Sequence, residues 1–179
     1  GEYIEIAPKL SEMGFNCMAV DLRSGGNVND ITNETNQRAI KLGKPTDYLD
    51  ALQDMESAVK YVKSQYEKAK IVILGSSYSA SFAIKLAGDN PILVDGALAF
   101  SPGEYFSKNY IKASSKNVKC PVFITSALKE EKVWEEIFHS IPSKHKHSFL
   151  PKTQGNHGSR ALWEKFHDSK DYWQAVSKF

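Results

Sequence analysis

Short runs of apolar and β-branched residues alternate along this chain with longer segments in which apolar residues recur every three or four positions. Runs of the first kind are typical of strands buried on both faces, and segments of the second kind are typical of amphipathic helices. Their alternation predicts an α/β protein with a mostly parallel sheet that is covered by helices on both faces. The 179 residues, of which 41% are hydrophobic, suffice for one compact core, so we expect residues 1–179 to form a single domain.

The predicted sheet has about five strands, of which the last is the weakest because half of it is His and Lys. The strands are expected at residues 15–22, 70–75, 94–100, 122–126 and 145–150. Helices are expected at residues 3–13, 48–66, 78–87, 132–140 and 159–176. Thr46 or Asp47 is the expected cap of the long second helix, and the last helix is expected to break near Asp168. The polar segment 27–43 is predicted to be a loop.

The charge distribution points to a small-molecule partner. The 23 basic and 21 acidic residues give a formal net charge of +2 and are spread along the chain, so no basic patch suggests nucleic acid or a membrane surface. No apolar run approaches the roughly 18 residues of a membrane span, and the first residues do not resemble a signal peptide. These features favour a cytoplasmic protein, with an exported form that has lost its signal as the alternative. The sequence leaves a homodimer open.

Neither cysteine is placed to bind a metal. Cys17 and Cys120 have no Cys or His neighbour at the spacing of metal ligands. No glycine-rich nucleotide-binding loop is present either. We therefore expect neither a metal nor an organic cofactor.

The motif that most directly suggests chemistry is a turn of small residues between a strand and a helix. The apolar run 71–74 leads into Gly75-Ser76-Ser77-Tyr78-Ser79, and a helical pattern follows. This layout matches the G-x-S-x-G pattern, in which a strained turn presents a nucleophilic serine, although Ser79 replaces the last glycine. Ser77 has the position of the nucleophile, and the backbone N–H of Tyr78 could stabilise an oxyanion. A tight structural connection is the alternative reading of these five residues.

A carboxylate and a histidine follow this turn in the order that a catalytic triad of this type requires. Glu130 comes a few residues after the strand expected at 122–126, with Glu131 as the alternative acid. His157 lies between Gly155 and Gly158, and such flanking glycines allow an irregular loop. Each residue alone has an ordinary surface explanation, but the order serine, acid, histidine favours a triad of Ser77, Glu130 and His157.

The chain resembles the α/β-hydrolase superfamily, and it is most similar to dienelactone-hydrolase-like esterases and lipases. The resemblance is carried by the turn 75–79, by Asn156-His157-Gly158, and by residues 21–26, which resemble a D-L-R-G-x-G turn. It implies a serine hydrolase that acts on carboxylic esters or lactones through an acyl-enzyme, with Glu130 orienting His157. The connection 101–121 is too short for a lid domain, so we expect an open site with Tyr78 and Tyr105 as substrate contacts.

The sequence also departs from the family in one respect. The resemblance implies a further strand and a His-Gly loop ahead of Tyr3, which would supply a second oxyanion donor and fill a place within the sheet. We therefore expect an N-terminally truncated hydrolase core with weak or absent esterase activity, unless the amides of Glu2 and Tyr3 substitute for that donor. The alternative function is a catalytically inactive scaffold of the same fold that is used for binding.

Overall fold

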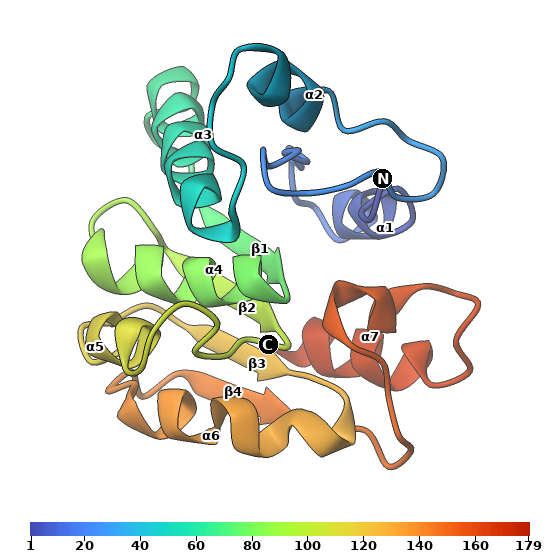
Figure 1. Cartoon of the computed structure of the whole chain (residues 1–179). Helices are drawn as coiled ribbons and strands as arrows, with labels where there is room; N and C mark the ends of the chain where they lie inside the picture. Colours follow the sequence, from blue (N-terminus) through green and yellow to red (C-terminus); the bar gives the residue numbers. More distant parts are fainter. The chain divides into compact units, whose positions relative to one another are not determined.

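The computed structural model describes residues 1–179, and the chain divides into two compact units, Gly1–Ala58 and Val59–Phe179. Each unit is described here by itself. Figure 1 shows the elements, with the first unit in blue to cyan and the second in green to red. None of the helices combines the length and the hydrophobicity that a membrane span requires.

The first unit consists of short helices joined by long connections. It contains α1 (Ile6–Glu12), α2 (Glu34–Lys41), the 3₁₀-helix η1 (Tyr48–Ala51) and the start of α3 (Leu52–Gln65). Asp47 precedes η1, and its N–H donates a hydrogen bond of 2.9 Å to the Asp50 carboxylate, as expected for a capping residue. The Arg23 guanidinium forms an ion pair with Asp54 at 2.6 Å, which fastens the connection before α2 to α3.

Two predictions for the first unit are wrong. Residues 15–22 form no strand, and their apolar side chains are largely exposed, with Phe15 at 49%. A strand requires a neighbour that completes its hydrogen-bond ladder, and no strand of the sheet pairs with this run. The segment 27–43 is not only a loop, because α2 lies within it. The Asn33 side chain caps this helix by accepting a hydrogen bond of 2.8 Å from the Asn36 N–H. The cap stabilises a helix in a segment whose polar composition had favoured a loop.

The second unit is built on a parallel sheet of four strands, one fewer than predicted. The strands β1 (Val72–Ser76), β2 (Gly96–Phe100), β3 (Val122–Thr125) and β4 (Lys146–Phe149) follow one another in this order across the sheet. Their last residues are in register, since Ser76 pairs with Phe100 and Phe100 pairs with Thr125. The residues that follow the strands therefore emerge at one edge of the sheet, where catalytic groups gather in open parallel sheets.

Helices cover both faces of this sheet. In Figure 1, α4 (Tyr78–Asp89), α5 (Tyr110–Ser115) and α6 (Glu131–Ser140) lie side by side along one face. The C-terminal helix α7 (Ser169–Lys178) packs on the other face, where Tyr172 contacts the Phe149 ring at 5.2 Å between centroids. The 3₁₀-helices η2 (Leu128–Glu130) and η3 (Gly158–Leu162) complete the unit. The predicted helix at 159–176 is thus interrupted, and α7 begins after Asp168.

Candidate active site

The turn between β1 and α4 holds Ser77 in a strained conformation. Its φ and ψ angles are +58° and −127°, a region that side chains other than glycine rarely adopt. The Ser77 N–H donates a hydrogen bond of 2.8 Å to the Phe100 carbonyl, which anchors the turn to β2. The half-buried side chain is consequently presented at the carboxyl edge of the sheet, between the end of a strand and the start of a helix.

The residues two positions before and after Ser77 explain how so sharp a turn closes. A Cβ atom on Gly75 would lie 2.3 Å from the Ser79 carbonyl oxygen, so only glycine permits α4 to approach β1 this closely. The hydroxyl of Ser79 accepts a hydrogen bond of 2.9 Å from the Ser76 N–H and donates one of 2.8 Å to the Ser76 carbonyl. Ser79 therefore adds a connection across the turn that a glycine could not make.

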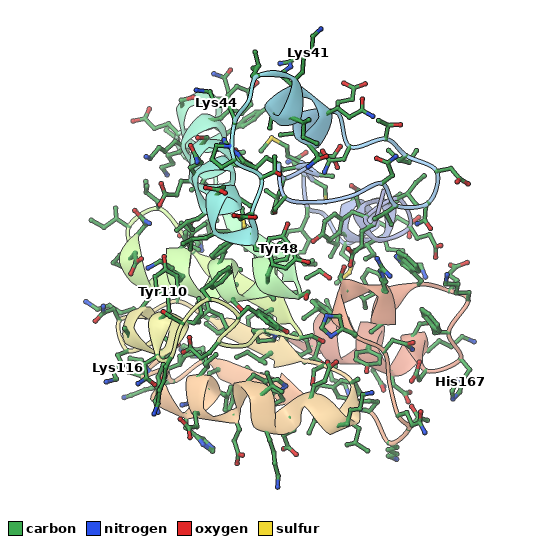
Figure 2. The ribbon with its side chains drawn as sticks, viewed as in Figure 1. Lys41, Lys44, Tyr48, Tyr110, Lys116 and His167 are labelled. Carbon is green, nitrogen blue, oxygen red and sulfur yellow. The ribbon has the colours of Figure 1, made fainter.

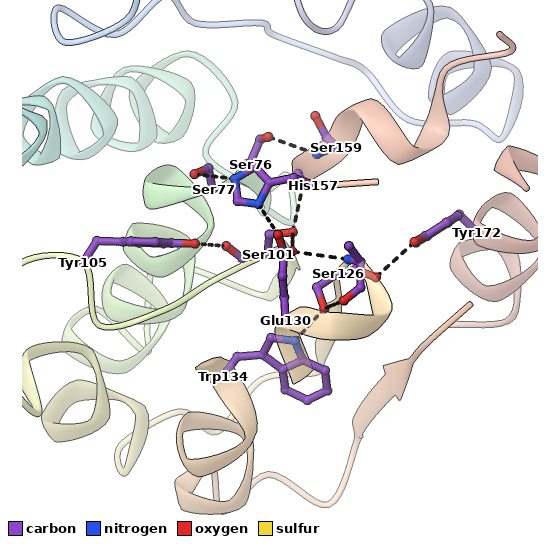
Figure 3. A network of polar contacts seen from close by, with 12 residues as sticks. Ser76, Ser77, Ser101, Tyr105, Ser126, Glu130, Trp134, His157, Ser159 and Tyr172 are labelled. Carbon is purple, nitrogen blue, oxygen red and sulfur yellow. Dashed lines mark hydrogen bonds and ion pairs between the residues drawn. The ribbon is translucent and has the colours of Figure 1, made fainter. Parts of the chain in front are cut away.

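The structure brings together the three residues that the sequence suggests as a triad. Figure 3 shows the imidazole of His157 between Ser77 and Glu130, which come from distant parts of the chain. The Nε2 atom of His157 lies 2.9 Å from the Ser77 hydroxyl, and Nδ1 lies 2.7 Å from the Glu130 carboxylate. The alternative acid, Glu131, is exposed at the start of α6, and it is Glu130 that meets the imidazole. His167 is exposed and lies at the periphery of Figure 2.

The second oxygen of Glu130 is held by groups that the sequence did not single out individually. Oε2 accepts a hydrogen bond of 2.7 Å from the hydroxyl of Ser101, the residue after β2, and one of 3.3 Å from the Ala127 N–H. In the sequence, Ser101 stands out only as the first residue of the short connection 101–121. The signal that identifies it is its position, since a serine directly after a buried strand lies at the same edge as the turn of Ser77.

The loop that carries His157 is fastened to the ends of two strands. The Gly158 N–H donates a hydrogen bond of 2.8 Å to the Ser101 hydroxyl after β2, and the Ser159 N–H donates one of 2.9 Å to the Ser76 hydroxyl of β1. The side chain of His157 is about half exposed, whereas Gly158 and Ser159 are buried. The imidazole therefore stands on an anchored backbone and still faces solvent.

Helix α7 supports the same loop from its other side. The Asp168 carboxylate accepts a hydrogen bond of 2.6 Å from the Thr153 hydroxyl. The Tyr172 hydroxyl donates to the Ser126 carbonyl at 3.0 Å and also interacts with the backbone N–H of Asn156. Burial is the main cause that raises the pKa of Tyr172 to about 12. The hydroxyl is thus neutral over the ordinary pH range and retains the proton that it donates.

The two tyrosines predicted to contact substrate differ in their setting. The Tyr105 hydroxyl donates a hydrogen bond of 2.8 Å to the Ser101 carbonyl and also lies within hydrogen-bonding reach of the Ser77 side chain. Burial of this hydroxyl raises the pKa of Tyr105, although 41% of the residue as a whole is exposed. Tyr78 opens α4, and its ring packs edge-on against Phe82 at 6.0 Å. Its backbone N–H is at the positive end of the helix.

The remaining candidates for other chemistry are not assembled into a site. No group of three His, Cys, Asp or Glu side chains is arranged to hold a metal ion. Cys17 is exposed and Cys120 is half-buried, and both are free thiols. The polar groups that converge at the sheet edge are therefore those around Ser77 and His157.

Comparison with solved structures supports the fold described above. No family model and no curated protein sequence matches the chain. Among solved structures, a cold-adapted esterase from an Arctic intertidal metagenomic library has a TM-score of 0.63 and 15% identity, and the match covers 99% of this chain and 76% of that one. The dienelactone hydrolase of Anabaena variabilis has a TM-score of 0.62 and 14% identity, with 83% and 67% covered.

An esterase of Pyrococcus furiosus is also similar, with a TM-score of 0.55 and 15% identity. The match covers 72% of this chain, which spans 59% of the length of that esterase. By name, these structures are esterases and a dienelactone hydrolase. The chain therefore has an α/β-hydrolase fold that is similar to the folds of dienelactone hydrolases and esterases.

Proposed function

We propose that this chain is a serine hydrolase that cleaves carboxylic esters or lactones, with Ser77, His157 and Glu130 as its catalytic triad. The observation that carries the proposal is the continuous chain of short contacts, 2.9 Å from Ser77 Oγ to His157 Nε2 and 2.7 Å from Nδ1 to Glu130. A hydroxyl, a base and an orienting carboxylate at these distances meet the geometric requirement for an activated nucleophile.

The reaction follows from the direction of these hydrogen bonds. With its proton on Nδ1, the imidazole donates to Glu130 and accepts the Ser77 proton at Nε2. Ser77 Oγ then adds to the carbonyl carbon, and His157 returns the proton to the alcohol oxygen as the ester bond breaks. Water attacks the resulting acyl-enzyme by the same route, which releases the acid and restores Ser77. The Glu130 carboxylate stabilises the imidazolium that forms in both halves.

Two groups near Ser77 are suited to stabilise the negative oxygen of the tetrahedral intermediate. The Tyr78 N–H is the first donor, because it opens α4 directly after the nucleophile and the helix N-terminus favours negative charge. The Tyr105 hydroxyl is the second, because it lies beside the Ser77 side chain. A neutral phenol can release its bond to the Ser101 carbonyl and donate to the developing charge instead.

The proposed activity can be tested with an active-site label and a simple ester. We expect a fluorophosphonate to modify Ser77 and the protein to hydrolyse p-nitrophenyl acetate slowly, with both reactions lost in Ser77→Ala and His157→Ala. Ser107→Ala and His167→Ala, which change an exposed serine and an exposed histidine, are the matched controls and retain both. Unlabelled Ser77 in the folded protein would contradict the proposal and favour a binding scaffold of the same fold.

A further inference from the structure

Ser101 occupies a position where a side chain is unfavourable for the backbone. It follows β2, is 1% exposed, and has a φ angle of +58°, in the left-handed region that glycine adopts more easily. Its N–H donates a hydrogen bond of 2.6 Å to the Thr125 carbonyl, so the neighbouring strand holds this conformation. The serine side chain must contribute something here that glycine would not.

The contacts of the Ser101 hydroxyl allow only one direction for its hydrogen bonds. The Gly158 N–H can only donate, so the hydroxyl oxygen accepts at 2.8 Å. An ionised Glu130 can only accept, so the single hydroxyl proton points at Oε2 over 2.7 Å. Both bonds form at once, so the Ser101 hydroxyl links the backbone of the loop that carries His157 to the Glu130 carboxylate.

We propose that Ser101 is a positioning residue that aligns Glu130 and His157 with each other through this one hydroxyl. Holding Oε2 leaves Oε1 facing the imidazole, while holding the Gly158 N–H fixes the backbone next to His157. Two bonds from the same atom thus set the relative position of acid and base. The consequence for turnover rests on the function proposed above, whereas the alignment itself is a property of the folded protein.

The comparison with Ser76 separates alignment from simple anchoring. The Ser76 hydroxyl accepts the next amide of the same loop, from Ser159, at 2.9 Å, and so fastens the loop to β1. The Ser101 hydroxyl, in contrast to this anchoring contact, is bonded to both the loop and the Glu130 carboxylate. Loss of Ser101 should therefore disturb the contact between His157 and Glu130 directly, beyond any loosening of the loop.

The experiment compares Ser101→Ala and Ser101→Gly with wild type by NMR spectroscopy, which needs no turnover. The readouts are the downfield proton signal of His157 Nδ1–H, which reports its bond to Glu130, and hydrogen exchange at the Gly158 amide. Ser101→Gly is included because glycine suits the positive φ, so this variant should fold even if Ser101→Ala does not. Ser143→Ala is the matched control, since that buried hydroxyl accepts a backbone N–H from His145 at the opposite end of β4.

In both Ser101 variants we expect the Nδ1–H signal to broaden or move upfield and Gly158 to exchange at least tenfold faster, with no change in Ser143→Ala. If wild type hydrolyses esters, kcat should fall about 10- to 100-fold with little change in KM, because a misplaced base slows the reaction more than it weakens substrate binding. A folded Ser101→Gly protein that keeps the wild-type signal and exchange rate would overturn the proposal. Altered signals in a protein without esterase activity would support the alignment and refute only the proposed function.

Discussion

At the turn of Ser77, the absence of a Cβ atom at Gly75 and the hydroxyl of Ser79 determine the local geometry. Gly75 leaves room for the Ser79 carbonyl, and the Ser79 hydroxyl binds both polar groups of the Ser76 backbone. The departure from the G-x-S-x-G pattern at Ser79 is therefore compatible with the turn. A small side chain fits at this position, and its hydroxyl forms hydrogen bonds with both the N–H and the carbonyl of Ser76.

Gly75→Ala tests the steric requirement at the turn. The new methyl group would meet backbone atoms at 2.3 Å, so β1 and α4 must move apart. We expect a loss of about 1–3 kcal/mol in the free energy of unfolding, in the range of overpacked interiors, together with loss of fluorophosphonate labelling. Urea denaturation measures the first effect. Gly26→Ala, where a Cβ meets nothing within 4 Å, is the control, and equal stability of the two variants would contradict the explanation.

Ser79→Ala tests the contribution of the hydroxyl that closes the turn. The substitution removes both hydrogen bonds to the Ser76 backbone, and the loss of hydrogen bonds to buried groups costs about 1–3 kcal/mol. We expect destabilisation of this order in urea and slower labelling of Ser77, because the nucleophile is less firmly held. A variant with wild-type stability and labelling rate would show that the two bonds are dispensable.

Among the elements, α7 supports the loop that carries His157, and the Tyr172 hydroxyl through which it does so ionises only at high pH. Because the pKa of Tyr172 is raised from 10.0 to about 12 by burial, the folded state favours the neutral phenol. The associated stability is complete below pH 10 and is lost as the pH rises through about 12. At most about 3 kcal/mol of the free energy of unfolding, the equivalent of this pKa shift, depends on the ionisation.

Tyr172→Phe should remove this pH dependence. We expect the variant to be less stable than wild type at pH 8, because Asn156 and Ser126 lose their hydroxyl partner. Between pH 10 and pH 11.5 the difference should narrow, because Tyr172 ionises in the unfolded wild-type chain but stays neutral in the folded one. Urea denaturation at a series of pH values measures both effects. A constant difference across this range would indicate that another group controls the alkaline stability.

The elements that the sequence predicted well are those whose residue composition alone is typical of the element. The strands at 72–76, 96–100, 122–125 and 146–149 lie within or overlap the predicted runs. The runs at 96–100 and 122–125 are buried and mostly apolar, as expected of inner parallel strands, whereas the strand at 146–149 is partly exposed and polar, and its prediction was the weakest. The run at 15–22 has the same composition, but a strand also needs a partner, which local composition does not specify. Helix α5 was not predicted, because its six residues show no clear apolar period.

On the scale of the whole second unit, the candidate site depends on the order of the sheet. Ser77 and His157 are 80 positions apart, yet they meet because consecutive parallel strands end at the same edge. The order of serine, acid and histidine, together with their positions after predicted strands, therefore indicated that these three side chains lie together, and their catalytic role stays a prediction. The links through Ser101 and Tyr172 were not predictable in this way, because they depend on the directions of side chains at that edge.

β1, the strand that leads to Ser77, has a strand neighbour on one side only, and Val72 is 40% exposed. Outer strands detach more readily than inner ones, since half of their backbone groups lack a ladder partner. The nucleophile thus follows an outer strand of the sheet, whereas Glu130 follows the inner strand β3. We expect labelling of Ser77 to be lost at a lower urea concentration than the circular dichroism signal. The backbone amides of β1 should also exchange their hydrogens faster than those of β3. Inactivation of this molecule would then begin as a local detachment, well before the fold as a whole is lost.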